Sequence, residues 1–415
     1  MAGGAGGPDS ALVTRPTVAV VLSGAAARGA FQAGALAEIV PTLHARGETP
    51  RIWLGTSAGA INATLWAAAA HLEPAEAAEW VLDRWRSTSD DDVYRPIPLS
   101  APRTALQYGV GFAFGLGTGA TSLLDTTPLR RQTEQTFPAE QLATNVLDGA
   151  VSAVGAVATR MPNAAESVVG SGRSTLFLDE HEPSTYGGDA ERALDVVRGP
   201  VRAEQVLASS AIPVAFPAVR VEHPPGAAGW YLDGGVRLNT PLHPAVHLGA
   251  DRVVVVSATG TSFGPPPEPD PGGRPRDVAD AAAQVLTAVL ADHTVEDLLT
   301  LRRVNRLVAA AREHGMSLPR PDRGSYRTVQ TLVVSPRPGE MGRLAADVFA
   351  ERTSGLGGLR EIDNRLVGRF IRGAGDGVGR RELLSYLFFD EEYFARSIEL
   401  GRAHARAALE LGWQQ

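Results

Sequence analysis

Residues 18–34 read VAVVLSGAAARGAFQAG, and this stretch decides how the rest of the chain is interpreted. Five apolar residues, 18–22, predict a buried strand, and the pattern from about Ala30 predicts a helix. The serine and glycine between them predict a tight turn. Such a turn presents unpaired backbone N–H groups, which suit a bound anion or a transient negative charge. We therefore expect an α/β protein with an anion-binding turn after its first strand.

Further along the chain, short apolar runs alternate with helical patterns. Strands are expected at 52–54, 149–157, 174–178, 252–257 and 328–334, and helices at 58–70, 75–86 and 202–209. This alternation predicts a largely parallel sheet, in which ligands bind at the carboxyl ends of the strands. A Pro/Gly-rich stretch, 260–276, predicts a linker, and helical patterns follow it at 277–314 and 382–411.

The composition excludes several classes of chemistry. A net charge of −7 over 415 residues argues against a general nucleic-acid binder. The chain has no lysine and no cysteine, which excludes Schiff-base, P-loop and thiolate chemistry and Cys-based metal sites.

The ends and the apolar stretches suggest where the protein is located. The first residues carry no signal-peptide pattern and are expected to form a disordered lead, 1–13. Residues 105–124 lack charge but contain five glycines, which favours a flexible apolar loop or lid over a membrane span. We expect a cytoplasmic location, with peripheral membrane attachment left open.

A candidate nucleophile lies in the sequence Gly-Thr-Ser-Ala-Gly, residues 55–59. It follows a short apolar strand and precedes a helical pattern, which is the context of a nucleophile elbow carrying Ser57. The alternative is a glycine-serine turn in which Ser57 caps the helix.

A candidate base lies where a second apolar strand ends, in Tyr-Leu-Asp-Gly-Gly, residues 231–235. If burial raised the pKa of Asp233, its carboxylate could accept the serine proton directly. The alternative is a common Asp-Gly turn.

Other assignments fit less well. None of the nine histidines lies in a distinctive motif; His243 and His247 could share one helix face, and they lack the glutamate of a zinc-binding HExxH motif. Gly24 and Gly29 have P-loop spacing, but Ala30 and Phe31 follow in place of Lys-Ser/Thr. A dinucleotide fingerprint would need glycine at Ala26. The acidic run 90–92 is interpreted as a solvated loop, without a metal.

Taken together, four stretches resemble the patatin-like phospholipase family. They are SGAAARGAFQAGAL (23–36), GTSAGAINA (55–63), ASSAIPVAFPAV (208–219) and DGGVRLNTPL (233–242), and their order and spacing match the family pattern. The resemblance covers about 14–257. It implies a three-layer α/β/α sandwich with a catalytic domain over 14–259 and a mainly helical region, 277–415, that could pack on it.

The resemblance also implies the site. Ser57 would be the nucleophile and Asp233 its partner in a dyad, without histidine, metal or cofactor. Gly24, Ala25 and Ala26 would supply oxyanion-hole N–H groups and Arg28 would anchor their loop. The remaining supporting residues would be Gly29, Gly55, Gly59, Gly234 and Gly235. The reaction implied is hydrolysis of a carboxylic ester in a lipid at a membrane or micelle surface; homo-oligomer formation is left open.

One departure concerns the turn itself, because the family usually has glycine at all three positions 24–26. Alanine keeps the N–H donor but resists positive φ. We expect negative φ at both Ala25 and Ala26. The altered turn motivates one rival function, that of a non-catalytic lipid-binding relative. A hydrolase of soluble esters or thioesters is a further alternative.

Overall fold

The protein is described by a computed structural model over residues 16–96, 122, 124–162, 172–260, 294–319, 325–353 and 378–415. The expected N-terminal lead, nearly all of the apolar loop 105–124, the linker from residue 261 and the helical pattern over 277–293 lie outside these described residues.

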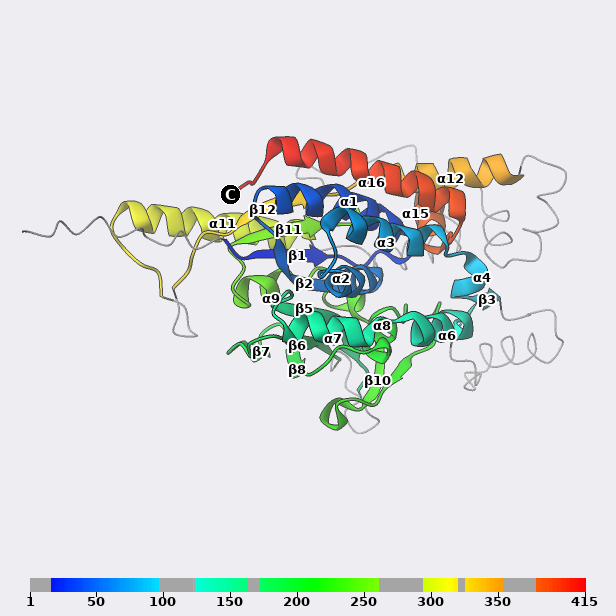
Figure 1. Ribbon diagram of the computed structural model, residues 1–415, viewed down its shortest axis with the longest axis horizontal. Helices are drawn as coiled ribbons and strands as arrows, with labels where there is room; N and C mark the ends of the chain where they lie inside the picture. Colours follow the sequence, from blue (N-terminus) through cyan, green and yellow to red (C-terminus); the bar gives the residue numbers. More distant parts are fainter. Residues whose placement is uncertain are drawn as a thin grey trace, which may run out of the picture.

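A ten-stranded sheet forms the centre of the molecule (Figure 1), and the strand order along its main path is β12-β11-β1-β2-β5-β6-β8-β7. The five strands from β12 to β5 are parallel, whereas β6 pairs antiparallel with β5, and β10 and β9 branch from β5. The bounds are β1 Val18–Leu22, β2 Pro50–Thr56, β5 Ala153–Arg160, β6 Arg173–Glu180, β7 Gly188–Asp189, β8 Leu194–Arg198, β9 Val219–Val221, β10 Gly229–Asp233, β11 Arg252–Val256 and β12 Gln330–Val334. A small pair, β3 Arg95–Pro96 and β4 Leu124–Asp125, lies apart. The mostly parallel α/β sheet is thus confirmed.

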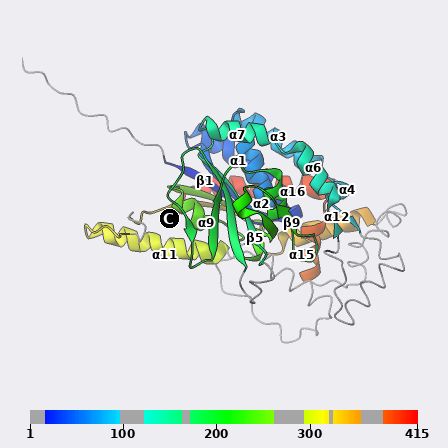
Figure 2. The same ribbon diagram turned by 90° about the horizontal axis from the view of Figure 1, so that it is seen from below.

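Helices cover both faces of the sheet (Figure 2). Val18, Val20 and Leu22 of β1 pack on one side, and Ala19 and Val21 pack on the other. This alternation explains the continuous apolar run, because a central parallel strand is buried on both faces. The helices are α1 Gly29–Ala45, α2 Ala58–Ala68, α3 Pro74–Arg86, α4 Asp90–Val93, α6 Thr127–Thr136, α7 Ala139–Leu147, α8 Ala203–Ser209, α9 Leu242–His247, α11 Thr294–Glu313, α12 Glu340–Thr353, α15 Val378–Leu387 and α16 Glu391–Leu411. In these described parts, no helix is both long and apolar enough to cross a membrane.

The C-terminal segments pack directly on the sheet and its helices. Strand β12 extends the sheet by pairing with β11, and α16 runs beside α1 (Figure 1). The two helices touch backbone to backbone: a Cβ at Gly34 would lie 2.1 Å from the Ile398 carbonyl oxygen, and one at Gly401 would lie 2.1 Å from that of Phe31. Such close approach is available only to glycine.

Several boundaries differ from the sequence predictions. The strand expected at 149–157 begins only at Ala153, because Gly149 has φ +72° in the turn before it. The helical pattern predicted over 382–411 is interrupted in the structure. Helix α15 ends at Leu387, and Asp390 caps the next helix, α16, by accepting from the N–H groups of Glu392 and Tyr393. The acidic run expected to be a loop forms α4, where Asp92 accepts from the Ser89 N–H at 2.9 Å.

Candidate active site

Ser57 lies between β2 and α2 in a sharply bent backbone conformation, with φ 57° and ψ −131°. Few non-glycine residues adopt positive φ, and such strain is typical of functional turns. The Ser57 N–H donates to Ser209 Oγ at 2.8 Å, and the Ser57 carbonyl accepts from Ala60 at 2.8 Å. Its side chain does not cap the helix, so the capping alternative is wrong. The backbone here is that of an elbow that presents the hydroxyl.

The flanking glycines allow this serine turn (residues 55–59) to fit between its neighbours. A Cβ at Gly55 would lie 2.2 Å from the Gly59 carbonyl oxygen. A Cβ at Gly59 would lie 2.5 Å from the Ser23 carbonyl oxygen and 2.6 Å from that of Leu22. Gly59 is therefore the point at which the serine turn touches the end of β1.

Asp233 ends β10, with 1% of its surface exposed. Its N–H donates to the Ala211 carbonyl at 2.9 Å, and its Oδ1 accepts from the Gly235 N–H at 2.7 Å. Asp233 thus does form the Asp-Gly turn that was the alternative interpretation, and the hydrogen bond of this turn fixes the position of the carboxyl group. Cβ atoms at Gly234 and Gly235 would lie 2.3 Å from the Val157 carbonyl oxygen and 2.9 Å from Asn239 Oδ1, so both positions need glycine.

Burial raises the pKa of the Asp233 carboxyl to about 7, although the Ser57 hydroxyl and the Gly235 N–H both act to lower it. The Ser57 hydroxyl is thus close enough to influence the carboxyl. Within the described residues, however, Oδ2 of Asp233 has no partner in hydrogen-bonding geometry. A loose contact of this kind is common in unliganded enzymes, where catalytic hydrogen bonds shorten on substrate binding.

The alanine turn (residues 23–28) lies at the end of β1, next to the serine turn. Ala25 has φ −141°, as expected, but Ala26 has φ +46°, so the prediction of negative φ at both alanines is wrong at Ala26. The left-handed conformation costs an alanine about 1 kcal/mol, and Ala26 adopts it at the first position of the short helix Ala26–Arg28. Gly24 cannot be replaced in the same way: a Cβ there would lie 2.3 Å from Asn239 Oδ1.

The N–H groups of this turn differ in availability. That of Gly24 donates to Asn239 Oδ1 at 2.9 Å, so it is engaged. Among the described residues, no acceptor is bonded to the N–H groups of Ala25, Ala26 or Ala58, the residue directly after Ser57. Two of the three predicted donors are therefore free, and Ala58 adds one that the sequence reasoning missed.

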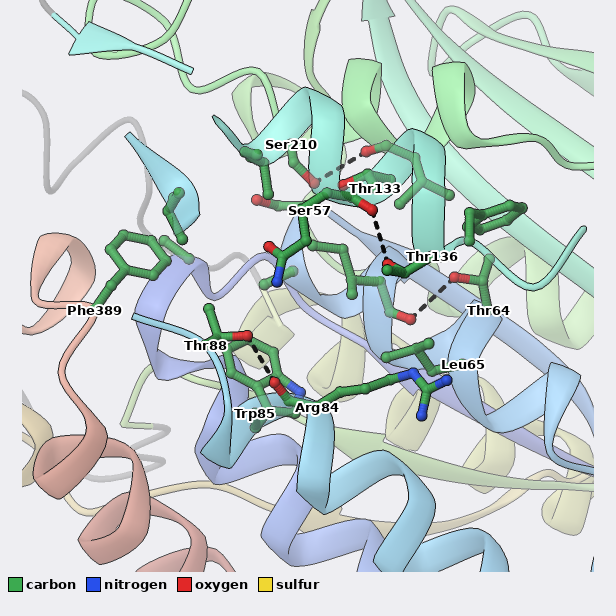
Figure 3. A pocket seen from close by; sticks show the side chains of 18 of the residues that line it. Ser57, Thr64, Leu65, Arg84, Trp85, Thr88, Thr133, Thr136, Ser210 and Phe389 are labelled. Atoms are coloured by element: carbon green, nitrogen blue, oxygen red, sulfur yellow. Dashed lines mark hydrogen bonds between the residues drawn. The ribbon is translucent and has the colours of Figure 1, made fainter. Parts of the chain in front are cut away.

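A cavity of about 270 Å³ opens at Ser57, which is itself only 4% exposed. Its surface is mostly apolar, and Ala26 and Ala58 line it together with Ser57. In Figure 3, Ser57 and Ser210 lie on one side of it, Trp85 of α3 on another, and Phe389, from the segment between α15 and α16, on a third. An apolar chain bound here would place its polar end at the serine.

Arg28 and Gly29 complete the junction with α1. Arg28 is 1% exposed, and its Nε donates to Ser385 Oγ of α15 at 2.9 Å. A Cβ at Gly29 would lie 2.4 Å from the Trp85 ring. A buried chain of amides supports the same region, because Asn62 donates to the Gly29 carbonyl at 2.9 Å and accepts from Trp85 Nε1 at 2.8 Å.

Sequence reasoning missed Asn239, Ser209 and the Asn62–Trp85 pair. Asn239, Ser209 and Asn62 lie inside the stretches that carry the resemblance, which was the available signal; Trp85 gave none. The histidines of α9, His243 and His247, have ring centroids 3.9 Å apart with the rings tilted by 47°. Together with Tyr186 they line a different cavity, of about 600 Å³.

Comparison with known proteins places this chain in a family. The model of the patatin-like phospholipases matches residues 20–246. The crystal structure of VipD from Legionella pneumophila is similar at 13% identity and a TM-score of 0.35, over 96% of this chain and 68% of that chain, which is too loose to carry an argument. No curated protein matches. Because the family model spans more than half of the 415 residues, the chain belongs to the patatin-like phospholipase family.

Proposed function

We propose that this protein is a serine lipid acyl hydrolase that cleaves carboxylic esters through Ser57 and Asp233. The observation that carries the proposal is the strained Ser57 at an apolar cavity, beside a buried carboxyl whose pKa is about 7. A group with that pKa can accept and return a proton near neutral pH. The proposed chemistry needs neither metal nor cofactor.

In the acylation step, Ser57 Oγ attacks the ester carbonyl while the Asp233 carboxylate takes the hydroxyl proton. The resulting oxyanion accepts hydrogen bonds from the free N–H groups of Ala25, Ala26 and Ala58. One such donor is typically worth about 2.7–4 kcal/mol of barrier. Collapse of the tetrahedral intermediate breaks the ester C–O bond, and Asp233 returns the proton to the leaving alcohol.

In the deacylation step, water attacks the acyl-serine and Asp233 takes one of its protons. The acyl C–O bond to Ser57 then breaks, Ser57 regains a proton from Asp233, and the fatty acid leaves. The apolar lining of the cavity supports a fatty acyl chain as the group held during both steps. We place the reaction at a membrane or micelle surface, where such chains are presented.

An active-site probe tests the proposal directly. A fluorophosphonate should label folded wild-type protein at Ser57, and Ser57→Ala should lose both labelling and ester hydrolysis. Folded wild-type protein that does not react would support the non-catalytic lipid-binding alternative and overturn the proposal.

A substrate series separates lipid from soluble esters. Wild type should hydrolyse p-nitrophenyl esters and also release fatty acid from phospholipid or acylglycerol vesicles. Ile61 lies one turn after Ser57 on the cavity wall, so Ile61→Trp should lower the long-chain to short-chain rate ratio by filling that space. Activity on short soluble esters alone, with an unchanged ratio in Ile61→Trp, would favour the soluble-ester hydrolase.

A further inference from the structure

The side chain of Arg28 joins the alanine turn to helix α15, more than 350 positions later in the chain. Its Nε and one terminal nitrogen donate to Ser385 Oγ at 2.9 and 2.6 Å, and the same terminal nitrogen donates to the Glu382 carboxylate and, at 3.2 Å, to the Glu382 carbonyl. The other terminal nitrogen donates to the Ala258 carbonyl at 3.2 Å. The guanidinium thus has all of its nitrogens engaged.

The surroundings of Arg28 hold it as a cation in one position. The guanidinium carbon lies 3.8 Å from the centroid of the Tyr386 ring. Glu382 is 19% exposed, so the pair is largely removed from water. Although burial acts against the charged form, the net effect of Tyr386, Glu382 and Tyr393 is to raise the pKa of Arg28.

The acceptors on α15 are themselves fixed. Ser385 Oγ donates to the Glu382 carbonyl at 2.6 Å, and the Ser385 carbonyl accepts from the Tyr393 hydroxyl at 3.1 Å. Tyr393 belongs to α16, which packs along α1. The Arg28 contacts with Glu382 and Ser385, called the Arg28 bracket below, therefore connect the alanine turn to the C-terminal helices.

The Arg28 bracket is directly connected to the residues that carry the free N–H groups. Arg28 closes the short helix after Ala26, and its own N–H donates to the Ala25 carbonyl at 3.0 Å. Ala26 is held at φ +46°, a conformation that persists only where the surroundings enforce it. Because the serine turn is not bonded to Arg28, a displaced Arg28 side chain would move the donors relative to Ser57.

We propose that Glu382 and Ser385 are positioning residues for the oxyanion hole, acting through Arg28 on the N–H groups of Ala25 and Ala26. Neither residue lines the cavity at Ser57. This inference rests on the proposed function, and it makes α15, which lies beyond the matched residues 20–246, part of the catalytic assembly.

The variants are Glu382→Gln and Ser385→Ala, with Glu351→Gln as the matched control. Glu351 also lies in the C-terminal part of the chain, and its side-chain carboxylate pairs with Arg396 at 2.6 Å. Unlike Glu382, it is exposed and lies on α12. Glu382→Gln and Ser385→Ala should lower kcat for ester hydrolysis about 10- to 100-fold with little change in KM, because a small misplacement of catalytic groups has effects of this size. Glu351→Gln should leave kcat unchanged.

A transition-state mimic distinguishes positioning from general damage. An alkyl trifluoromethyl ketone forms an oxyanion on Ser57, so its inhibition constant should rise about as much as kcat falls in both variants. The affinity for a fatty acid, which needs only the cavity, should not change. Equal losses for ketone and fatty acid would indicate damage to the cavity and overturn the inference.

Hydrogen exchange provides a readout that does not depend on activity. The amides of Arg28 and Gly29, bonded to the Ala25 and Ala26 carbonyls, should exchange faster in both variants, while amides of α2 keep their wild-type rates. If wild type neither labels nor hydrolyses, the proposed function fails and exchange alone decides whether α15 holds the turn. Unchanged exchange and unchanged kcat in well-folded variants would overturn the inference.

Discussion

The serine turn and the alanine turn lie side by side at the carboxyl ends of neighbouring parallel strands, yet they are stabilised in different ways. Both contain one strained non-glycine residue, Ser57 at φ 57° and Ala26 at φ 46°. The serine turn is enclosed by its own glycines and by Ser209. The alanine turn is held by Asn239 and, through Arg28, by α15.

The two turns of this one site therefore depend on contacts from different parts of the chain. The strain at Ser57 is supported by the glycines of its own motif and by Ser209, 152 positions later in the chain. The strain at Ala26 is supported by groups more than 200 and more than 350 positions away in the chain. The first turn should therefore tolerate changes in the C-terminal helices, whereas the second should not.

The largest expected effect is at the carboxyl that serves the serine turn. Asp233→Asn keeps the shape but cannot accept a proton, so ester hydrolysis should fall by about 10⁴-fold. Steady-state kinetics with short-chain esters measures this. Retention of more than a tenth of the wild-type rate would mean that another group is the base.

The same substitution tests the pKa through stability. The folded pKa of about 7 lies above the ordinary value for aspartate, about 3.9. The carboxyl's contribution to stability is therefore full below about pH 4 and is lost as the pH rises through 7. As the pH rises from 5 to 8, the unfolding free energy of Asp233→Asn should therefore increase by about 2.6 kcal/mol relative to that of wild type. Urea unfolding at both pH values measures it, and a constant difference would contradict the raised pKa.

Gly59 is the place where the two turns can be forced apart. Gly59→Ala puts a methyl group against the Ser23 and Leu22 carbonyls, which should destabilise the fold by about 1–3 kcal/mol. Activity should fall further than stability predicts, because both turns move. Thermal unfolding and kinetics measure the two effects. Ala60→Gly, the next position in the same helix, is the control, and it should lose only about 1 kcal/mol of stability.

The pH profile of kcat/KM should change by about tenfold per pH unit on its acidic side. Because the base must be deprotonated, kcat/KM should fall tenfold for each unit below the Asp233 pKa of about 7 and level off above it. Rates between pH 5 and pH 9 show this directly. A profile centred near pH 4 would indicate a carboxyl exposed to water.

The smallest effect compares the two alanines. Ala26→Gly removes the penalty at φ +46° and should stabilise the protein by about 0.5–1 kcal/mol, whereas Ala25→Gly, at φ −141°, should destabilise it slightly. Chemical unfolding of the pair measures the difference. The opposite order would mean that the Ala26 methyl group contributes more by packing than its backbone costs.

The fold and the serine turn could be predicted because their signals are local. Strand β1 reads as a continuous apolar run since both its faces are buried, and Ser57 lies in a pattern of five consecutive residues. The conformation of Ala26 could not be predicted, since alanine favours negative φ unless distant contacts impose another conformation. Glu382 and Ser385 gave no signal either, because a buried partner for an arginine has no fixed spacing along the chain.

The dependence of the alanine turn on α15 also has a consequence for the time at which the protein becomes reactive. A ribosome adds about 5–20 residues per second, so the strands β1, β2 and β5 exist well before residue 385 is made. Until α15 and α16 have been released, the serine turn can be complete while its partner turn is not. The growing chain should therefore carry a formed but inactive serine until α15 is in place.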